Sequence, residues 1–176
     1  PYEPVAAASS GPNSPGTMAT DSGSGGTKNW TNPDYAKVED GSDATAHAAY
    51  SNIPGCSIYD QRVRIVKGGV IGSTDKADAN AWPTSLAYTT YGDSSNLWGE
   101  TWTSDDINSV NFGVVISANG SGCVTNYTTY YLKATNFGFS VPAGSTINGI
   151  TVEIKKKNRS AVGNNYYADI DHIRIT

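Results

Sequence analysis

Short runs in which apolar and polar residues alternate, separated by turns, constrain this sequence most strongly. Ile150, Val152 and Ile154 alternate with polar residues, so one face of an extended segment is predicted to be buried and the other hydrated. Similar runs between Gly-, Asn- and Asp-containing turns give strand candidates at residues 62–66, 112–118, 130–141, 147–157 and 167–176. Alternation favours antiparallel pairing, because buried parallel strands read as unbroken apolar runs. The pattern predicts an all-β fold, an antiparallel β-sandwich that is jelly-roll-like.

The composition agrees with strands and tight turns rather than helices. Charged residues make up 16% of the chain, against about 25% in an average soluble domain. The sequence instead has 19 Gly and 11 Tyr residues. One short helical turn is expected at residues 104–109, where Thr103 or Ser104 can cap it and Asp105 and Asp106 suit a helix N-terminus.

The sequence divides into two parts, an arm at residues 1–29 and a β-sandwich domain at residues 30–176. The first part is dominated by Pro, Gly, Ser, Ala and Thr, including the run Ser-Gly-Ser-Gly-Gly at residues 22–26. Such a segment buries too little apolar surface to offset the entropy of ordering it. We expect a flexible arm or linker, which is either a disordered tail or an arm that orders against a neighbouring subunit.

The charge pattern argues against nucleic acid and membrane partners. The formal net charge is -4 and the isoelectric point is near 5.0, so no global positive field attracts a phosphate backbone. The one basic run, Lys155–Lys157 with Arg159, is interpreted as solvated charge at the end of a strand. No stretch approaches the ~18 consecutive apolar residues needed to cross a bilayer, so no membrane insertion is expected.

Few residues offer catalytic or metal chemistry, so we expect no enzyme and no catalytic residue. His47 and His172 are the only imidazoles, and none of the common hydrolase, zinc-protease or nucleotide-binding motifs occurs. His172 lies in an alternating segment, where a cross-strand hydrogen bond or ion pair is expected rather than proton transfer. Asp40 and Asp43 flank Gly41 and are interpreted either as ligands of a structural calcium ion or as Asx-turn residues. No other cofactor is expected.

Two cysteines, Cys56 and Cys123, each follow a glycine in a turn-like context. Two cysteines without close histidine or cysteine neighbours cannot make a zinc site. They form either one disulfide or two free thiols, and a disulfide indicates an oxidising, extracellular setting.

Aromatic residues supply the candidate ligand contacts. Ring faces stack on sugars, and we select Tyr88, Tyr91 and Trp82 as candidate ligand-binding residues in the middle of the chain. The remaining tryptophans are expected to pack in the core or anchor loops: Trp30, Trp98 and Trp102.

Several blocks of the chain carry a family resemblance. These blocks are WTNP (30–33) with DG (40–41), VRIVKGG (63–69), YG (91–92) with LWGETW (97–102), DIN (106–108) with NFGV (111–114), TNFGFSVP (135–142) with INGI (147–150), and DHIRIT (171–176). The chain resembles, over most of residues 27–176, a family of uncharacterised β-sandwich domains of tailed-phage virion and environmental bacterial surface proteins. The resemblance implies a location on a virion or cell surface and carries no catalytic residue with it.

The order of these blocks departs from the family, because residues 57–123 and 124–160 are exchanged. Three new connections restore the family order: Cys56 to Val124, Ser160 to Ser57, and Cys123 to Ala161. We hypothesise either a true rearrangement or three exchanged loop connections. A disulfide would bring two of the junctions within ~6 Å between Cα atoms. Trypsin distinguishes the two, because the present order releases a peptide spanning residues 38–62 and the family order continues residues 38–56 into 124–133.

Fold and resemblance together predict a non-enzymatic virion structural protein, a decoration, fibre or tail-associated protein that acts in assembly or surface adhesion. Its expected location is the virion surface or the extracellular space. Its expected partners are other virion or filament subunits in a homo-oligomer, and a cell-surface glycan. Two alternatives stay open: a carbohydrate-binding module of a secreted bacterial protein, and a subunit of an extracellular filament that exchanges a strand through residues 1–29.

Overall fold

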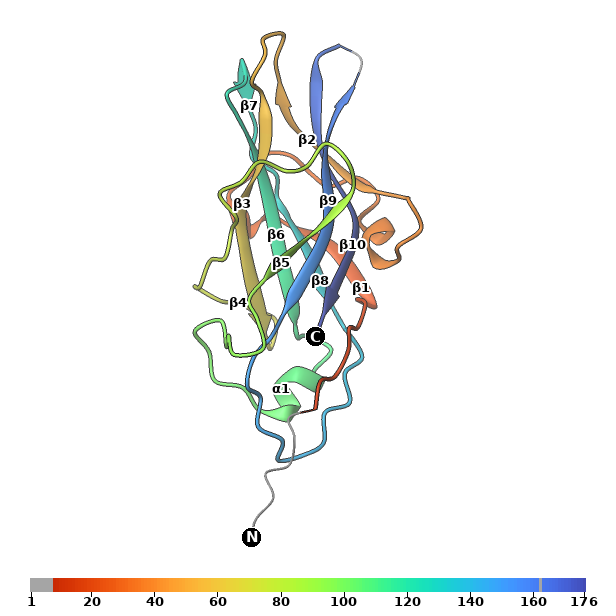
Figure 1. The fold of residues 1–176 in the computed structure, drawn as a ribbon, viewed down its shortest axis with the longest axis vertical. Coiled ribbons are helices and arrows are strands. Elements are labelled where there is room, and N and C mark those ends of the chain that lie inside the picture. The colour runs from red at the N-terminus through yellow and green to blue at the C-terminus, as the bar shows by residue number, and fades with distance from the viewer. Residues whose placement is uncertain (1–7, 162) are drawn as a thin grey trace.

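The chain folds as two antiparallel sheets packed face to face, and the sequence-based prediction of an all-β sandwich is confirmed. The computed structural model describes residues 8–161 and 163–176. One five-stranded sheet has the order β1-β8-β6-β3-β4 and the other has the order β5-β9-β10-β2-β7. The strands run along the long axis of the body (Figure 1). From β4 to β9 the chain alternates between the two sheets, so its connections wrap around the core.

The first sheet consists of β1 (Thr17–Asp21), β8 (Tyr131–Thr135), β6 (Gly113–Ser121), β3 (Ser57–Lys67) and β4 (Val70–Ile71). The second sheet consists of β5 (Ala87–Tyr91), β9 (Val152–Ala161), β10 (Asn165–Ile175), β2 (Ala44–Tyr50) and β7 (Thr125–Asn126). The helical segments are η1 (Ser22–Ser24), η2 (Pro33–Lys37) and α1 (Ser104–Asn108). No helix among residues 8–161 and 163–176 is long and apolar enough to span a membrane.

The core lies between the inner faces of the two sheets, where apolar side chains from alternate strand positions meet. Val152 and Ile154 of β9 are fully buried, as the alternation predicts, and so are Ile170 and Ile173 of β10. They belong to one apolar cluster with inner-face residues of β3 and β6 from the opposite sheet. Burying one such side chain contributes about 1.5–3 kcal/mol. Trp30 and Trp98 are buried and Trp102 packs against the core, as expected.

Two predicted strands are too long. Residues 147–157 were expected to be extended, but β9 begins at Val152. Residues 130–141 were also expected to be extended, but β8 ends at Thr135. Asn136 and Gly138 both adopt the left-handed region, with φ of 59° and 66°. An extended strand cannot pass through such angles, so the chain leaves the sheet at this point.

The predicted helical turn is confirmed as α1, which begins with a capping box. The backbone N–H of Asp106 donates to the Thr103 hydroxyl at 3.2 Å, and the backbone N–H of Thr103 donates to the Asp106 carboxylate at 2.9 Å. These two bonds satisfy donors that a helix N-terminus otherwise leaves unpaired.

The domain begins inside the segment that was predicted to be an arm, so the boundary at residue 29 is wrong. Strand β1 pairs with β8, and its Met18 is buried. Asn13 exchanges two backbone hydrogen bonds with Ile175 of β10, at 2.8 and 3.0 Å. Residues 13–21 therefore contact both sheets. Backbone hydrogen bonds supply the stabilisation that their small side chains do not. Of the predicted arm, residues 1–7 lie outside the described residues.

A closing loop, residues 72–86, covers the side of the sandwich between β3 and β9 (Figure 1). Its backbone donates to β3 from Lys76 to Val63 at 2.8 Å, and from Trp82 to Ile58 at 2.7 Å. On its other side, the carbonyl of Pro83 accepts from the backbone of β9 at 2.7 Å. The closing loop therefore ties the two sheets together along this side.

The three junctions of the hypothesised exchange, at residues 56/57, 123/124 and 160/161, lie at one end of the body. Cys56 and Cys123 form a disulfide with 4.5 Å between their Cα atoms. Cys56, Ser57 and Ser160 line one pocket at the same end. Fold and disulfide do not distinguish the two segment orders, and the tryptic peptides that contain residues 38–56 remain the test of the order.

Candidate functional site

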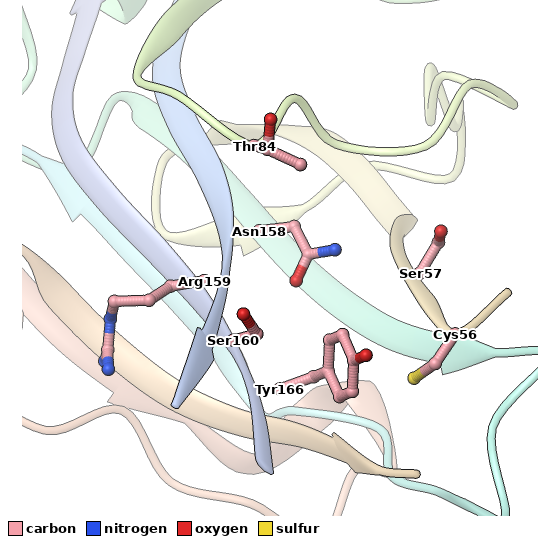
Figure 2. Close-up of a pocket in the computed structure, with 7 residues that line it drawn as sticks. All are labelled: Cys56, Ser57, Thr84, Asn158, Arg159, Ser160 and Tyr166. Atoms are coloured by element: carbon pink, nitrogen blue, oxygen red, sulfur yellow. The ribbon is translucent and has the colours of Figure 1, made fainter. Parts of the chain in front are cut away.

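The candidate site is a small pocket at the disulfide end of the sandwich, which we call the end pocket. It has a volume of about 360 Å³. Four parts of the chain form it: the start of β3, the closing loop, the last residues of β9 and the start of β10 (Figure 2). Its lining residues are Cys56, Ser57, Thr84, Asn158, Arg159, Ser160 and Tyr166.

The end pocket is lined mostly by neutral polar groups. Ser57, Thr84, Ser160 and Tyr166 bring hydroxyls, and Asn158 brings an amide that points into the space between them (Figure 2). Asn158 is only 9% exposed, and within residues 8–161 and 163–176 its Oδ1 has no hydrogen-bond partner. Leaving a buried acceptor unpaired costs about 1–3 kcal/mol. The pocket therefore presents an acceptor that suits an O–H or N–H donor from outside the chain.

Arg159 at the rim brings little free charge to the end pocket. Its guanidinium pairs with the buried carboxylate of Asp169, with Nη2 at 3.2 Å from Oδ1, and stacks 4.5 Å from the centroid of the Tyr167 ring. The hydrogen bond to Asp169 raises the pKa of Arg159, against the effect of its partial burial. The charge is compensated on the outer face, so the pocket favours an uncharged ligand over an anion.

A second polar cluster lies deeper between the sheets, and we call it the inner cluster. Asp60 of β3 is its centre and accepts four hydrogen bonds: from Lys156 Nζ at 2.6 Å, Trp82 Nε1 at 2.7 Å, the Tyr91 hydroxyl at 2.8 Å and the backbone N–H of Asp78 at 2.9 Å. Lys156 also contacts the Tyr91 hydroxyl. Every group of the cluster has a partner, as buried polar groups require.

The inner cluster corrects two predictions from the sequence. Tyr91 and Trp82 are each only 3% exposed, so the prediction that they bind a ligand with open ring faces does not hold. Lys156 is buried as well, although it belongs to the basic run that was interpreted as solvated. Its position follows from alternation, because Lys156 points to the same face of β9 as Val152 and Ile154.

Burial perturbs the acid–base behaviour of this cluster. Desolvation lowers the pKa of Lys156, and the charge and hydrogen bond of Asp60 oppose that shift. Desolvation, reinforced by Asp60, raises the pKa of Tyr91 far above its usual range, so this phenol stays protonated and donates to the carboxylate.

Tyr88, the third predicted ligand-binding residue, is partly exposed on the outer face of the second sheet. Its hydroxyl donates to Glu39 at 2.9 Å and lies 2.8 Å from Nδ1 of His172. Desolvation, with the Glu39 hydrogen bond as a second cause, raises the pKa of Tyr88 to about 12. Arg174 covers the ring at 4.2 Å from its centroid. Tyr88 is therefore engaged within the protein and lies outside the end pocket.

His172 makes hydrogen bonds, as predicted from its place in the strand. Nε2 lies 2.9 Å from the Ser14 hydroxyl, and Nδ1 faces Tyr88. Desolvation lowers the pKa of this imidazole, which favours the neutral ring at these contacts. His172 thus fastens the N-terminal segment to β10.

The predicted calcium ligands have other partners in this structure. Oδ1 of Asp40 accepts from the backbone N–H of Ser42 at 2.8 Å, which is an Asx-turn, and Asp43 pairs with Lys157 at 2.5 Å. Among the residues that the structure describes, no group of three or more acidic, histidine or cysteine side chains is placed to hold a metal ion.

A larger groove of about 740 Å³ lies at the opposite end of the body, beside α1 and the end of β10. Phe112, Phe139, Ile147 and Ile150 give it a mostly apolar lining. In the described part of the chain, none of the buried polar atoms without a partner belongs to this groove. The end pocket is therefore the better candidate for specific recognition.

Comparisons with known proteins returned no matching family model, curated protein or solved structure.

Proposed function

We propose that this chain is a non-enzymatic adhesion module of a virion surface or another extracellular assembly, and that it contacts a cell-surface glycan through the end pocket. The observation that carries the proposal is the buried Oδ1 of Asn158, which has no hydrogen-bond partner among residues 8–161 and 163–176 and lies among four hydroxyl-bearing side chains. Sugar hydroxyls both donate and accept hydrogen bonds, so they match a lining of hydroxyls and one free carbonyl oxygen.

The size and lining of the end pocket support a sugar as its ligand. Small-molecule pockets usually span about 300–1,000 Å³, and the end pocket, at about 360 Å³, falls at the lower end of that range. The ring of Tyr166 adds an apolar surface on which a pyranose can stack. The nearby disulfide is typical of proteins in oxidising, extracellular settings.

The strand pairing supports a self-contained module more than strand exchange between filament subunits. Residues 17–21 belong to the segment that strand exchange would donate, yet they complete the sheet of their own chain as β1. Of the four edge strands, β4 and β7 span only two residues each and β1 and β5 span five, and short edges discourage pairing with another chain. Contacts with neighbouring subunits in an assembly then fall to sheet faces and loops.

A glycan array with matched variants tests the proposal. Asn158→Leu removes the free acceptor at similar volume, and Tyr88→Phe on the outer face serves as the control. We expect the wild type and Tyr88→Phe to bind the same glycans, with affinity at least about tenfold weaker in Asn158→Leu, since tenfold corresponds to 1.4 kcal/mol. Circular dichroism and intact disulfide mass confirm that each variant is folded.

Two outcomes contradict glycan binding at the end pocket. One is an array without signal above background for the folded wild type, and the other is equal binding by Asn158→Leu. If the array is blank while analytical ultracentrifugation and electron microscopy show ordered oligomers, the chain acts in assembly alone.

A further inference from the structure

Two groups that can react with each other are held in contact between the sheets. Lys156 comes from β9 in one sheet and Asp60 from β3 in the other. Their Nζ and Oδ1 atoms are 2.6 Å apart, and the two side chains are 2% and 0% exposed. An amine held against a carboxyl group, with both side chains buried, has the geometry from which an amide forms.

We propose that Lys156 and Asp60 condense to an intramolecular isopeptide bond, Nζ to Cγ, that joins the two sheets covalently. The inference goes beyond the proposed function and does not rest on it. The inner cluster supplies both reacting groups and the groups that move protons between them, so no external reactant is needed.

The first step converts the ion pair into its neutral form. Tyr91 contacts Lys156 Nζ and donates its hydroxyl proton to Asp60 Oδ2 at 2.8 Å. A proton from the ammonium can therefore pass to the phenol oxygen while the phenol proton passes to the carboxylate. The products are a neutral amine and a neutral carboxylic acid, and Tyr91 returns to its starting state.

In the second step the amine lone pair attacks Cγ of Asp60. The negative charge that develops on Oδ1 is met by the Trp82 Nε1–H at 2.7 Å, in the manner of an oxyanion hole. A second proton then leaves Nζ, passes through Tyr91 to the hydroxyl formed on Oδ2, and the Cγ–Oδ2 bond breaks. One C–N bond forms, one C–O bond breaks, and one water molecule is released.

The buried position favours this reaction for two reasons. Burial lowers the pKa of Lys156, so the neutral, nucleophilic amine is easier to reach than at a surface lysine. Two charges in a low-dielectric interior also carry a desolvation cost that their attraction only partly offsets. A neutral amide removes both charges, and its oxygen keeps the indole hydrogen bond.

Mass spectrometry of the folded, reduced wild-type chain tests the proposal directly. We expect an intact mass lower than the sequence mass by one water molecule. Because trypsin does not cleave after an amidated lysine, the digest should contain the Asp60 peptide with a branch that carries Lys156. Lys155→Met, on the outer face, should keep the water loss, whereas Lys156→Met should abolish it.

Tyr91→Phe tests whether Lys156 and Asp60 react with the help of the Tyr91 hydroxyl or only lie in contact. It keeps the ring but removes the hydroxyl, so we expect the unlinked mass to persist in freshly folded protein. The full sequence mass in folded wild type overturns the proposal and leaves Lys156 and Asp60 as an ion pair. A water loss mapped to a succinimide at Asp40-Gly41, without a branched peptide, overturns it as well.

Discussion

Lys155 and Lys156 are neighbours on β9, yet they lie on opposite faces of the sheet and in opposite environments. Lys155 is on the outer face, 20% exposed, and pairs with Glu39 at 2.6 Å and with Asp171 at 3.0 Å. Lys156 is on the inner face and is enclosed by Asp60, Tyr91 and aromatic rings. The hydrogen bonds to Glu39 and Asp171 raise the pKa of Lys155 to about 12, whereas burial lowers the pKa of Lys156.

This difference shows that strand alternation, and not residue type, decides what a charged side chain contributes to the free energy of unfolding. At outer-face pairs whose two side chains are both partly exposed, such as Glu153 with Arg174, a partner replaces water at little net gain, because solvent already stabilises both charges. The inner pair has lost its water and depends entirely on its partners. The free energy of unfolding should therefore respond very differently to changes on the two faces.

The largest effect is expected when the inner acceptor is removed. Asp60→Ala leaves a buried lysine without a counter-charge and also orphans the Trp82 indole N–H. We expect a loss of about 3–5 kcal/mol in the free energy of unfolding, measured by chemical denaturation. Asp75→Ala is the control, because Asp75 is 28% exposed, lies on the closing loop that also carries Trp82, and accepts a hydrogen bond from the backbone N–H of Val63 at 3.0 Å. Equal losses in the two variants would contradict the larger contribution of the inner cluster to the free energy of unfolding.

A smaller effect is expected from Lys155 at high pH. Its pKa is raised on folding, so folding favours the ammonium form. This contribution is complete below about pH 10.5 and is lost as the pH rises through about 12. Denaturation curves across this range should show a steeper fall in stability for the wild type than for Lys155→Met. Parallel curves would show that the two ion pairs of Lys155 do not stabilise the fold.

The smallest effect is expected at an outer-face pair. Glu153 and Arg174 face each other on β9 and β10, 2.8 Å apart, with side chains 25% and 29% exposed. Glu153→Gln should lower the free energy of unfolding by only about 0.2–1 kcal/mol, and added salt should shrink the difference further. A loss above about 2 kcal/mol would contradict the distinction between the two faces.

The sequence predicted the fold wherever local patterns decide the structure. Alternation in residues 150–155 placed Val152 and Ile154 in the core, and the threonine–aspartate spacing placed the helical turn at α1. Strand β1 was missed because its pattern is weak, with Met18 as its one buried side chain, and its stability comes from pairing with a distant strand. Pairing with a strand far away in the sequence produces no recognisable pattern in the local sequence of β1.

The candidate site was largely missed, for the same reason. Ser57, Thr84, Asn158 and Tyr166 come from separate segments, and only the packing of the two sheets brings them together. The inner cluster did leave a signal, because continuing the apolar alternation beyond Ile154 places Lys156 inward. The general rule that runs of basic residues are solvated gave the opposite prediction for Lys156.

Strand β10 runs from the end pocket to the opposite end of the body. Tyr166, near its first residue, lines the end pocket, and Ile175, its last residue, pairs with Asn13 at the far end of the body. At ~3.4 Å per residue, the 11 residues of β10 separate the two poles by roughly 35 Å. A scaffold that binds this chain beside Asn13 and Ile175 would leave the disulfide end facing outward. The end pocket would then be accessible to an approaching surface.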